Sequence, residues 1–292
     1  MNKTPIRHPV VTAALWMLGA LLSFSAMAVS GRELSKELGT FEIVFLRSVV
    51  AFVIVATLVS RSGWRQITAR RLGLHALRNV AHFAGQFGWF YAIALIPLAE
   101  VFAIEFTVPA WTMLLAVMLL GERITGARLL AIGLGFVGML IILRPGLAVV
   151  SAGALAVVGA SFCFALSNTL TKKLAMHESA LAIVFYMTAI QTPLGMLPAL
   201  HQWITPPLAM WPWLLVVGAT ALAAHFCMAR ALKLADATVV VPMDFLRLPL
   251  IALAGFVFYG ETLDWLVLAG AVIMVAGNFA NILAERSRTA AR

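Results

Sequence analysis

Charged residues are scarce in this sequence: they make up 11% of its 292 residues, while 62% are apolar. Soluble domains carry about 25% charged and about 45–50% apolar residues, so a soluble globular fold is excluded. The breaks between the apolar runs are short, and none is long enough to hold a separate soluble domain. We therefore expect an all-α integral membrane protein whose apolar surface is covered by lipid.

The motifs of several enzyme classes are missing. The two cysteines, Cys163 and Cys227, lie in apolar runs, which excludes a disulfide framework and offers no metal-ligand spacing. Because there is no GxxxxGK(S/T) loop, we expect neither ATP as the direct energy source nor an ATPase subunit. His177-Glu178 lacks the second histidine of a metalloprotease site, and no GxSxG elbow occurs. We predict no cofactor, no metal and no enzymatic activity; a channel is the alternative to a carrier.

Ten apolar runs approach the roughly 20 residues that a helix needs to cross a bilayer. The first is interpreted as a retained helix, although Ala26-Met27-Ala28 resembles a cleavage site, because the run is longer than the core of a usual signal peptide. The ten predicted spans are 10–30, 40–60, 74–95, 98–120, 125–143, 152–170, 180–200, 209–230, 237–258 and 263–284.

Lysines and arginines are distributed unevenly between the two sides of this ten-span arrangement. With both termini inside, the inner segments hold fifteen of them and the outer segments three, namely Arg32, Lys36 and Arg144. This excess predicts an inner (plasma) membrane protein with cytoplasmic N- and C-termini. The net charge of +9 is thus explained by topology and by contact with anionic lipid of the bilayer, and no nucleic-acid partner is expected.

The two halves of the chain, 1–145 and 146–292, match each other at an offset of about 137–140 residues. Each half would hold five spans, an odd number, so the second half must begin on the opposite side of the membrane. Such inverted repeats are typical of secondary transporters, whose substrate site lies near the midplane between the halves. The matched segments include Tyr91-Ala-Ile-Ala-Leu95 with Met228-Ala-Arg-Ala-Leu232, and Leu120-Gly-Glu122 with Tyr259-Gly-Glu261.

These matched segments, together with Pro97-Leu-Ala and Pro109, resemble the EamA-type repeat of the drug/metabolite transporter superfamily. The resemblance implies two five-helix domains, ten helices, cytoplasmic termini and alternating access around a central cavity. In length and layout the chain is similar to bacterial YddG-type exporters of aromatic and other neutral amino acids. It also resembles S-adenosylmethionine uptake carriers, above all around Phe41-Glu-Ile-Val-Phe-Leu-Arg47.

Ionisable residues inside spans need a partner or a wet cavity. Glu105 and Asp244 occupy corresponding positions in the two repeats, one in each half of the membrane. They are candidates for proton or cation sites or for gate latches, with structural salt bridges as the alternative. Arg47 lies at the depth of Glu105 and is its expected partner, whereas Arg247 lies three residues after Asp244. Either arginine is a candidate to bind a substrate carboxylate; internal pairing is the alternative.

Several polar, aromatic and proline residues complete the candidate site. His82, Trp111, Trp16 and Asn168 are candidates to line a cavity by ring stacking or hydrogen bonding, with helix packing as the alternative. Gln86 and Trp89 lie beside His82, while Arg78 is expected to reach the membrane interface. The candidate hinges, which interrupt repeat-related spans, are Pro109, Pro242 and Pro249. The predicted close-packing positions are Ala131, Gly135, Gly138, Gly270 and Gly277.

The sequence therefore predicts a secondary transporter that moves small metabolites by alternating access. Transport would be driven by the cargo gradient or by a coupled proton. Amino-acid export, aromatic amino acids included, is the leading expectation for the cargo, by resemblance and because the spans carry tryptophan and charges of both signs. Uptake or exchange of a nucleoside-like metabolite such as S-adenosylmethionine, or export of drugs, is the alternative.

Overall fold

The computed structural model describes residues 9–67, 71–121, 125–145, 150–175, 177–234, 243–244 and 246–290. Throughout these residues the regular elements are helices. In the first half they are α1 (Pro9–Leu34), α2 (Thr40–Ser62), the short η1 (Trp64–Gln66), α3 (Leu72–Leu95), α4 (Leu98–Glu105), α5 (Val108–Leu120) and α6 (Gly126–Leu143). In the second half they are α7 (Ala152–Ala175), α8 (Ala180–His201), the short η2 (Leu208–Met210), α9 (Trp211–Leu234), α11 (Arg247–Tyr259) and α12 (Trp265–Ala290).

Eight helical segments of the described chain are long and apolar enough to cross a membrane. The outer surface of the bundle is apolar as well: on α11, Leu253 is 59% exposed and Phe256 is 63% exposed. A large apolar surface of this kind is stable only against lipid or another apolar partner. The chain is therefore a multi-pass membrane protein. Its ten-span topology and the side on which its termini lie stay predictions.

Helix α3 has 24 residues but is not among the eight segments, because one of its faces is polar. Residues three and four apart share a face of a helix, and the polar residues of α3 follow this spacing. Their side chains are buried against neighbouring helices, whereas Leu77 and Val80 are exposed. The helix thus turns its polar face inward, where the candidate site lies. The buried polar face consists of His75, Arg78, Asn79, His82 and Gln86.

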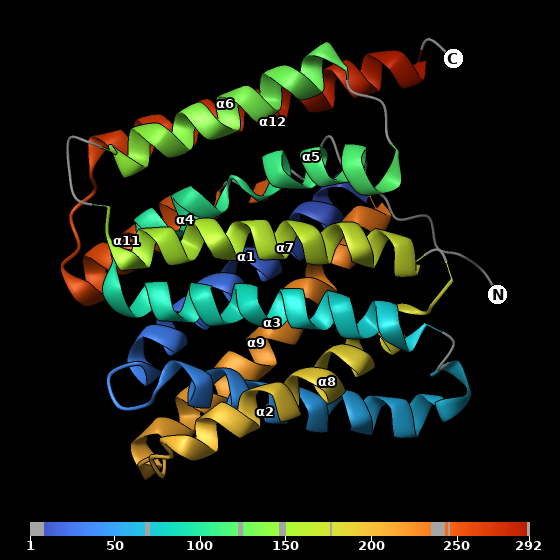
Figure 1. Cartoon of the computed structure of the whole chain (residues 1–292), viewed down its shortest axis with the longest axis vertical. Helices are drawn as coiled ribbons and strands as arrows, with labels where there is room; N and C mark the ends of the chain where they lie inside the picture. Colours follow the sequence, from blue (N-terminus) through green and yellow to red (C-terminus); the bar gives the residue numbers. More distant parts are fainter. Residues whose placement is uncertain are drawn as a thin grey trace.

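The helices of the two halves pack against each other in reciprocal pairs. Helix α1 packs on α9, which is the counterpart of α3. Helix α3 packs on α7, which is the counterpart of α1. Helices α2 and α8, and α6 and α12, pair with their own counterparts, while α4 packs on α11, the counterpart of α5. In Figure 1, α6 and α12 lie together along one edge, α2 and α8 lie along the opposite edge, and the other helices lie between them. Reciprocal pairing is the pattern that two-fold symmetry requires.

Corresponding helices of the two halves run in opposite directions. On α1, Gly19 lies against Cys227 and Phe24 contacts His225, so the residue numbers of α9 fall as those of α1 rise. The same reversal between α3 and α7 is seen in the pairs Arg78–Thr171 and Gly88–Ala156. Because α1 and α3 both end at the same end of the bundle, their counterparts α7 and α9 both point the other way. The second repeat is therefore inverted relative to the first.

Helices α6 and α12 form the closest of these contacts. A Cβ atom on Gly138 would lie 2.5 Å from the carbonyl oxygen of Gly270, which confirms the predicted close packing. Beyond the helix ends, Arg144 forms an ion pair with Asp264. The hydrogen bond from Arg144 holds the pKa of the Asp264 carboxyl below its ordinary value, and the backbone N–H of Leu266 contributes in the same direction. Each repeat thus contributes a helix to an interface made by backbone contact and one charged pair.

The fourth predicted span is broken into α4 and α5. The break lies at Phe106 and Thr107, and Pro109 stands in the first turn of α5. Proline has no N–H to donate to the carbonyl four residues earlier, which is that of Glu105. The break therefore leaves Glu105 at an open helix end. Its role as a hinge stays a prediction.

Candidate functional site

A cavity of about 300 Å³ lies between the two repeats. Its walls come from α1, α2, α3, the α4–α5 break, α7, α9 and α11, so that both repeats contribute to it. This volume is at the lower end of the range for small-molecule sites, about 300–1,000 Å³. Six of the predicted site residues line the cavity: Arg47, His82, Glu105, Asn168, Asp244 and Arg247.

Arg247 stands between the two predicted acids. Its Nη2 atom is 3.4 Å from Oε1 of Glu105 and 3.4 Å from Oδ2 of Asp244. The guanidinium also lies over the rings of Phe24, at 4.8 Å, and Phe102, at 5.0 Å. Two carboxylates thus share one guanidinium, which the aromatic rings hold in place. This group can bind a cation or exchange a proton, since among the described residues the two carboxylates share the one cation.

Glu105 has a second partner, because the indole Nε1 of Trp89 donates a hydrogen bond of 2.9 Å to its Oε2 atom. The expected pairing of Glu105 with Arg47 is wrong: the acid pairs with Arg247. Equal depth in the membrane does not place two residues on facing sides of their helices. Helix α4 packs on α11, which carries Arg247, whereas α2, which carries Arg47, packs chiefly on α8 and α9.

Arg47 is 4% exposed, and its Nε and Nη1 atoms have no hydrogen-bond partner within the described residues. Its guanidinium carbon lies 5.8 Å from the centre of the Phe90 ring. His82 is also buried, and its Nδ1 atom is 3.0 Å from Nε2 of Gln191 on α8. This hydrogen bond fixes the ring of His82 at the cavity wall. Arg47, in contrast, is a buried charge that has no ion-pair partner among the residues that the structure describes.

Trp111 and Trp16 do not line the cavity as the described residues define it. Trp111 packs edge-on against Phe136, with ring centres 4.6 Å apart. Trp16 packs edge-on against Phe226 at 5.8 Å, and the guanidinium of Arg230 lies over its ring at 5.3 Å. Both are therefore placed as packing residues, which is the alternative that their sequence pattern left open.

Other sequence-based expectations have mixed outcomes. Arg78 is 8% exposed and donates hydrogen bonds to Thr171 and Asn79, so its expected position at the membrane interface is wrong. Pro109 lines the cavity, and Pro249 lies in the first turn of α11. The third candidate hinge, Pro242, lies outside the described residues.

Some residues of the cavity wall were not predicted from the sequence. The rings of Phe24, Phe90 and Phe164 line it, but phenylalanine is so frequent in membrane spans that a cavity position gives no separate signal. Helical spacing could have found Phe90, which is four residues after Gln86, and Phe164, which is four residues before Asn168. Within the described residues, no group of three His, Cys, Asp or Glu side chains is arranged to hold a metal.

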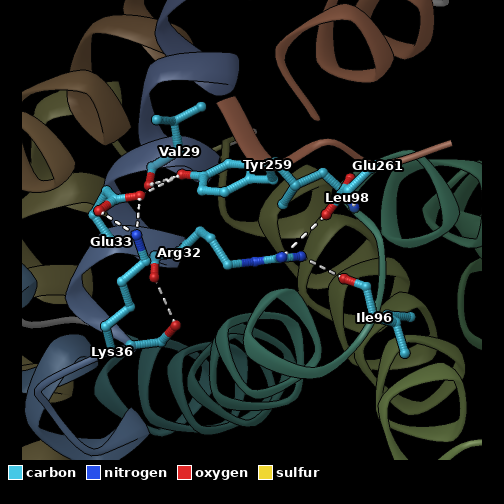
Figure 2. Close-up of polar contacts among 9 residues, drawn as sticks. Val29, Arg32, Glu33, Lys36, Ile96, Leu98, Tyr259 and Glu261 are labelled. Carbon is cyan, nitrogen blue, oxygen red and sulfur yellow. Dashed lines mark hydrogen bonds and ion pairs between the residues drawn. The ribbon is translucent and has the colours of Figure 1, made fainter. Parts of the chain in front are cut away.

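A second polar group lies at one end of the bundle, and we call it the end cluster: Arg32, Glu33, Lys36, Tyr259 and Glu261. Arg32 of the first repeat forms an ion pair of 3.0 Å with Glu261 of the second (Figure 2). Tyr259 donates a hydrogen bond of 2.9 Å to Glu33, which also accepts from Lys36. The end cluster therefore ties the end of α1 to the segment that follows α11.

The end cluster also reaches the turn between α3 and α4. Arg32 donates a hydrogen bond to the carbonyl oxygen of Ile96, and Glu261 accepts one of 2.9 Å from the backbone N–H of Leu98 (Figure 2). Leu98 begins α4, and a carboxylate is favourable at a helix N-terminus because the first N–H groups there have no partner within the helix. Met27 of α1 lines the cavity, and Arg32 lies five residues, about 8 Å, further along. The end cluster thus links the two repeats beyond one end of the cavity.

An inverted pair of helical repeats around a cavity lined by aromatic and charged side chains defines the class of membrane transporters. The chain belongs to the EamA-like transporter family, whose repeat matches residues 11–144 and 151–283. The family consists of transporters, and the chain is a transporter and not an enzyme. The likeness to a crystal structure that covers 96% of this chain and 98% of its own, with a TM-score of 0.65 at 15% identity, shows the same fold.

Relatives with named substrates cover nearly the whole chain. The S-adenosylmethionine uptake transporter of Rickettsia bellii is 29% identical over 271 residues, 93% of each chain. The riboflavin transporter of Vibrio cholerae is 32% identical over 277 residues, 92% of each chain. The pseudopaline exporter of Pseudomonas aeruginosa is 30% identical over 88% of this chain and 90% of its own. These relatives support a transporter of small metabolites.

Proposed function

We propose that this protein is a secondary transporter that carries a ring-bearing zwitterionic metabolite through the cavity between its repeats. The observation that carries the proposal is the composition of the cavity wall. It combines carboxylates, guanidinium groups and aromatic rings in about 300 Å³. Aromatic faces stack on a planar ring, and charges of both signs match a zwitterion better than a bulky dication.

S-adenosylmethionine is the first candidate cargo, since it joins a nucleoside ring to an amino acid. The name of the Rickettsia bellii relative supports this choice, as does the resemblance around Arg47. The relatives' names do not support amino-acid export, the leading expectation from sequence, and aromatic amino acids become the second candidate. The named relatives include both an uptake transporter and an exporter, so the direction of transport is left to experiment.

We further propose ten spans, cytoplasmic termini in the inner membrane and transport by alternating access. The end cluster supports this mechanism because it joins the two repeats beyond one end of the cavity. If the excess of inner lysines and arginines sets the orientation, Arg32 and Lys36 lie on the outer side. The cavity would then be closed toward the outside in this structure. Opening that side requires the contacts of Arg32 with Glu261 and Ile96 to break.

A coupled proton is a second feature of the proposal. Glu105 and Asp244 share the single guanidinium of Arg247, which leaves one carboxylate without its own cation. Such an acid in a membrane cavity can accept a proton when the cavity faces the more acidic side. Transport against a cargo gradient would then follow the pH gradient.

Uptake into liposomes tests the proposal. Purified protein would be reconstituted and supplied with labelled S-adenosylmethionine, tryptophan or riboflavin, with and without a pH gradient. We expect S-adenosylmethionine or tryptophan to accumulate, and Arg247→Gln to reduce uptake at least 10-fold. Arg65→Gln, which changes an exposed arginine outside the cavity, is the matched control and should transport normally. If neither zwitterion exceeds empty liposomes, the proposed cargo class is wrong.

A further inference from the structure

Arg47 differs from the other inward-facing arginines of this bundle. Arg247 has two carboxylate partners, and Arg78 donates hydrogen bonds to Thr171 and Asn79. Arg47 is as deeply buried as they are, with 4% of its surface exposed. Nevertheless, two of its three nitrogen atoms have no partner within the described residues.

In the part of the chain that the structure describes, the surroundings of Arg47 provide no counter-charge of its own. The charged and titratable groups that share the cavity with it are His82 on α3, His225 on α9, Arg247 on α11, Asp244 and Glu105. The two acids are both engaged by Arg247, and Glu105 is also held by Trp89. Phe90 gives only a cation–π contact, at 5.8 Å.

A buried guanidinium without a carboxylate or full hydrogen bonding is strongly unfavourable. In an inverted-repeat carrier, such an unpaired charge in the cavity wall can serve to bind a charged cargo. A ligand that brings an anionic group supplies the missing partner and is bound more tightly because of it. A guanidinium also fits a carboxylate with two parallel hydrogen bonds, which a neutral group cannot form.

We propose that Arg47 binds the carboxylate of the cargo and thereby selects ring-bearing carboxylates over the same molecules without that group. This inference rests on the proposed function, since it assigns one part of the same cavity. Arg47 lies against Phe90, next in sequence to Trp89, so the carboxylate subsite borders the aromatic wall. The acids held by Arg247 line another part of the wall and remain available for the amine or cationic end of the cargo.

Paired ligands that differ in the carboxylate alone test the assignment. The probes are S-adenosylmethionine against decarboxylated S-adenosylmethionine, and tryptophan against tryptamine. Binding to the purified wild-type protein should be at least 10-fold tighter for the carboxylate member of a pair. Arg47→Gln should reduce this preference to less than 2-fold, and Arg47→Lys should retain part of it. Arg78→Gln, which removes a buried arginine that does not line the cavity, should keep the full preference.

Thermal unfolding without any cargo gives a second readout. Because Nε and Nη1 of Arg47 have no hydrogen-bond partner within the described residues, Arg47→Gln should leave the midpoint of unfolding unchanged or raise it. Arg78→Gln should lower the midpoint, since it removes hydrogen bonds to Thr171 and Asn79. A fall in Arg47→Gln as large as that in Arg78→Gln would show a structural arginine and overturn the inference.

The outcomes separate this inference from the function on which it rests. If wild-type protein binds none of the four probes, the proposed cargo class and the Arg47 assignment both fail. If wild-type protein binds the carboxylates preferentially and Arg47→Gln keeps that preference, the transport proposal stands and Arg47 is not the subsite. If it binds both members of each pair equally, a ring-bearing cargo stands, but the carboxylate is not recognised and the Arg47 assignment is wrong.

Discussion

At the scale of single residues, the centre of the bundle is built around one shared guanidinium. Arg247 contacts Glu105 from the first repeat and Asp244 from the second, and Trp89 orients Glu105 from the other side. Because Arg247 and Asp244 belong to the second repeat and Glu105 to the first, a relative movement of the repeats changes the distance between Glu105 and Arg247. A cargo or a proton that occupies one acid would therefore alter the connection between the repeats.

Glu105→Gln and Asp244→Asn should reduce transport more than they reduce stability. Each change keeps the shape and the hydrogen-bonding capacity of the side chain but removes its charge. A hydrogen bond between charged groups is worth about 1.5–3 kcal/mol, which corresponds to a loss of roughly 10- to 100-fold in rate. Uptake into liposomes and the midpoint of thermal unfolding would be measured for both variants. Glu37→Gln, an exposed change, is the control; wild-type uptake in both variants would assign the acids to structure alone.

The charged centre could be predicted from sequence, but its pairing could not. Ionisable side chains inside apolar spans stand out, and the repeat relates Glu105 to Asp244 by number alone. The partner of Glu105 depends on which helix faces which, and this follows from packing between α4 and α11. The aromatic residues of the cavity wall were the hardest to predict. Trp16 and Trp111 lie in apolar spans like the residues that line the cavity, but they pack against Phe226 and Phe136.

At the scale of helices, glycine sets how closely α6 and α12 approach. A Cβ atom on Gly138 would meet backbone, whereas one on Gly133 of the same helix would meet nothing within 4 Å. Since α6 and α12 pair across the repeats, their contact holds the two halves together at one edge of the bundle (Figure 1).

Gly138→Ala should lower the stability of the protein, while Gly133→Ala should not. The added methyl group at position 138 has to displace the backbone of α12, a strain that typically costs about 1–3 kcal/mol. At position 133 the same change improves helix propensity by up to about 1 kcal/mol. Thermal unfolding of the two variants in detergent gives the comparison. Equal midpoints would show that α6 and α12 are further apart than the structure places them.

The end cluster makes a prediction about movement of the helices. Arg32→Gln removes the ion pair with Glu261 and weakens the contact with Ile96, so the cavity should open more often at that end. A cysteine at Met27 in a Cys163→Ala, Cys227→Ala background reports such opening through its reaction with a membrane-impermeant maleimide added outside. We expect several-fold faster labelling in Arg32→Gln and no change in Glu37→Gln. Equal rates in both would mean that the end cluster does not gate the cavity.

The positions of the helices along the chain were predictable because each helix coincides with an apolar run. The break in the fourth span could be anticipated from Pro109. The exact site of the break could not, since the structure interrupts the helix at Phe106 and Thr107, before the proline itself. The inward face of α3 was only partly recognised. Its polar residues follow helical spacing, but the position of Arg78 near one end of its span favours the interface. Its partner Thr171 lies in the other repeat, and the sequence alone does not show this contact.

At the scale of the whole molecule, the inverted arrangement predicts which segments share a side of the membrane. Thr171 bonds to Arg78 near the start of α3, and η1 with Arg65 precedes that helix, so Arg65 and Lys172 lie at the same end of the bundle. Lys36 lies at the other end, in the end cluster.

Single cysteines at Arg65, Lys172 and Lys36 should therefore show two classes of accessibility in intact cells. The cysteines at positions 65 and 172 should be protected from an impermeant reagent added outside, and the cysteine at position 36 should react. Permeabilised cells, in which all three should react, provide the control. Labelling of positions 65 and 172 from opposite sides would contradict the inverted arrangement and the carrier mechanism derived from it.

The reciprocal pairing of α1 with α9 and α3 with α7 bears on the evolutionary origin of the protein. Each of these four helices packs against a helix of the opposite half. That partner is the counterpart of another helix in its own half. A single five-helix polypeptide inserted into the bilayer in both orientations would thus contain every partner that the interface needs. Halves produced as two separate polypeptides should likewise reassemble, because the linker between α6 and α7 joins units that already recognise each other.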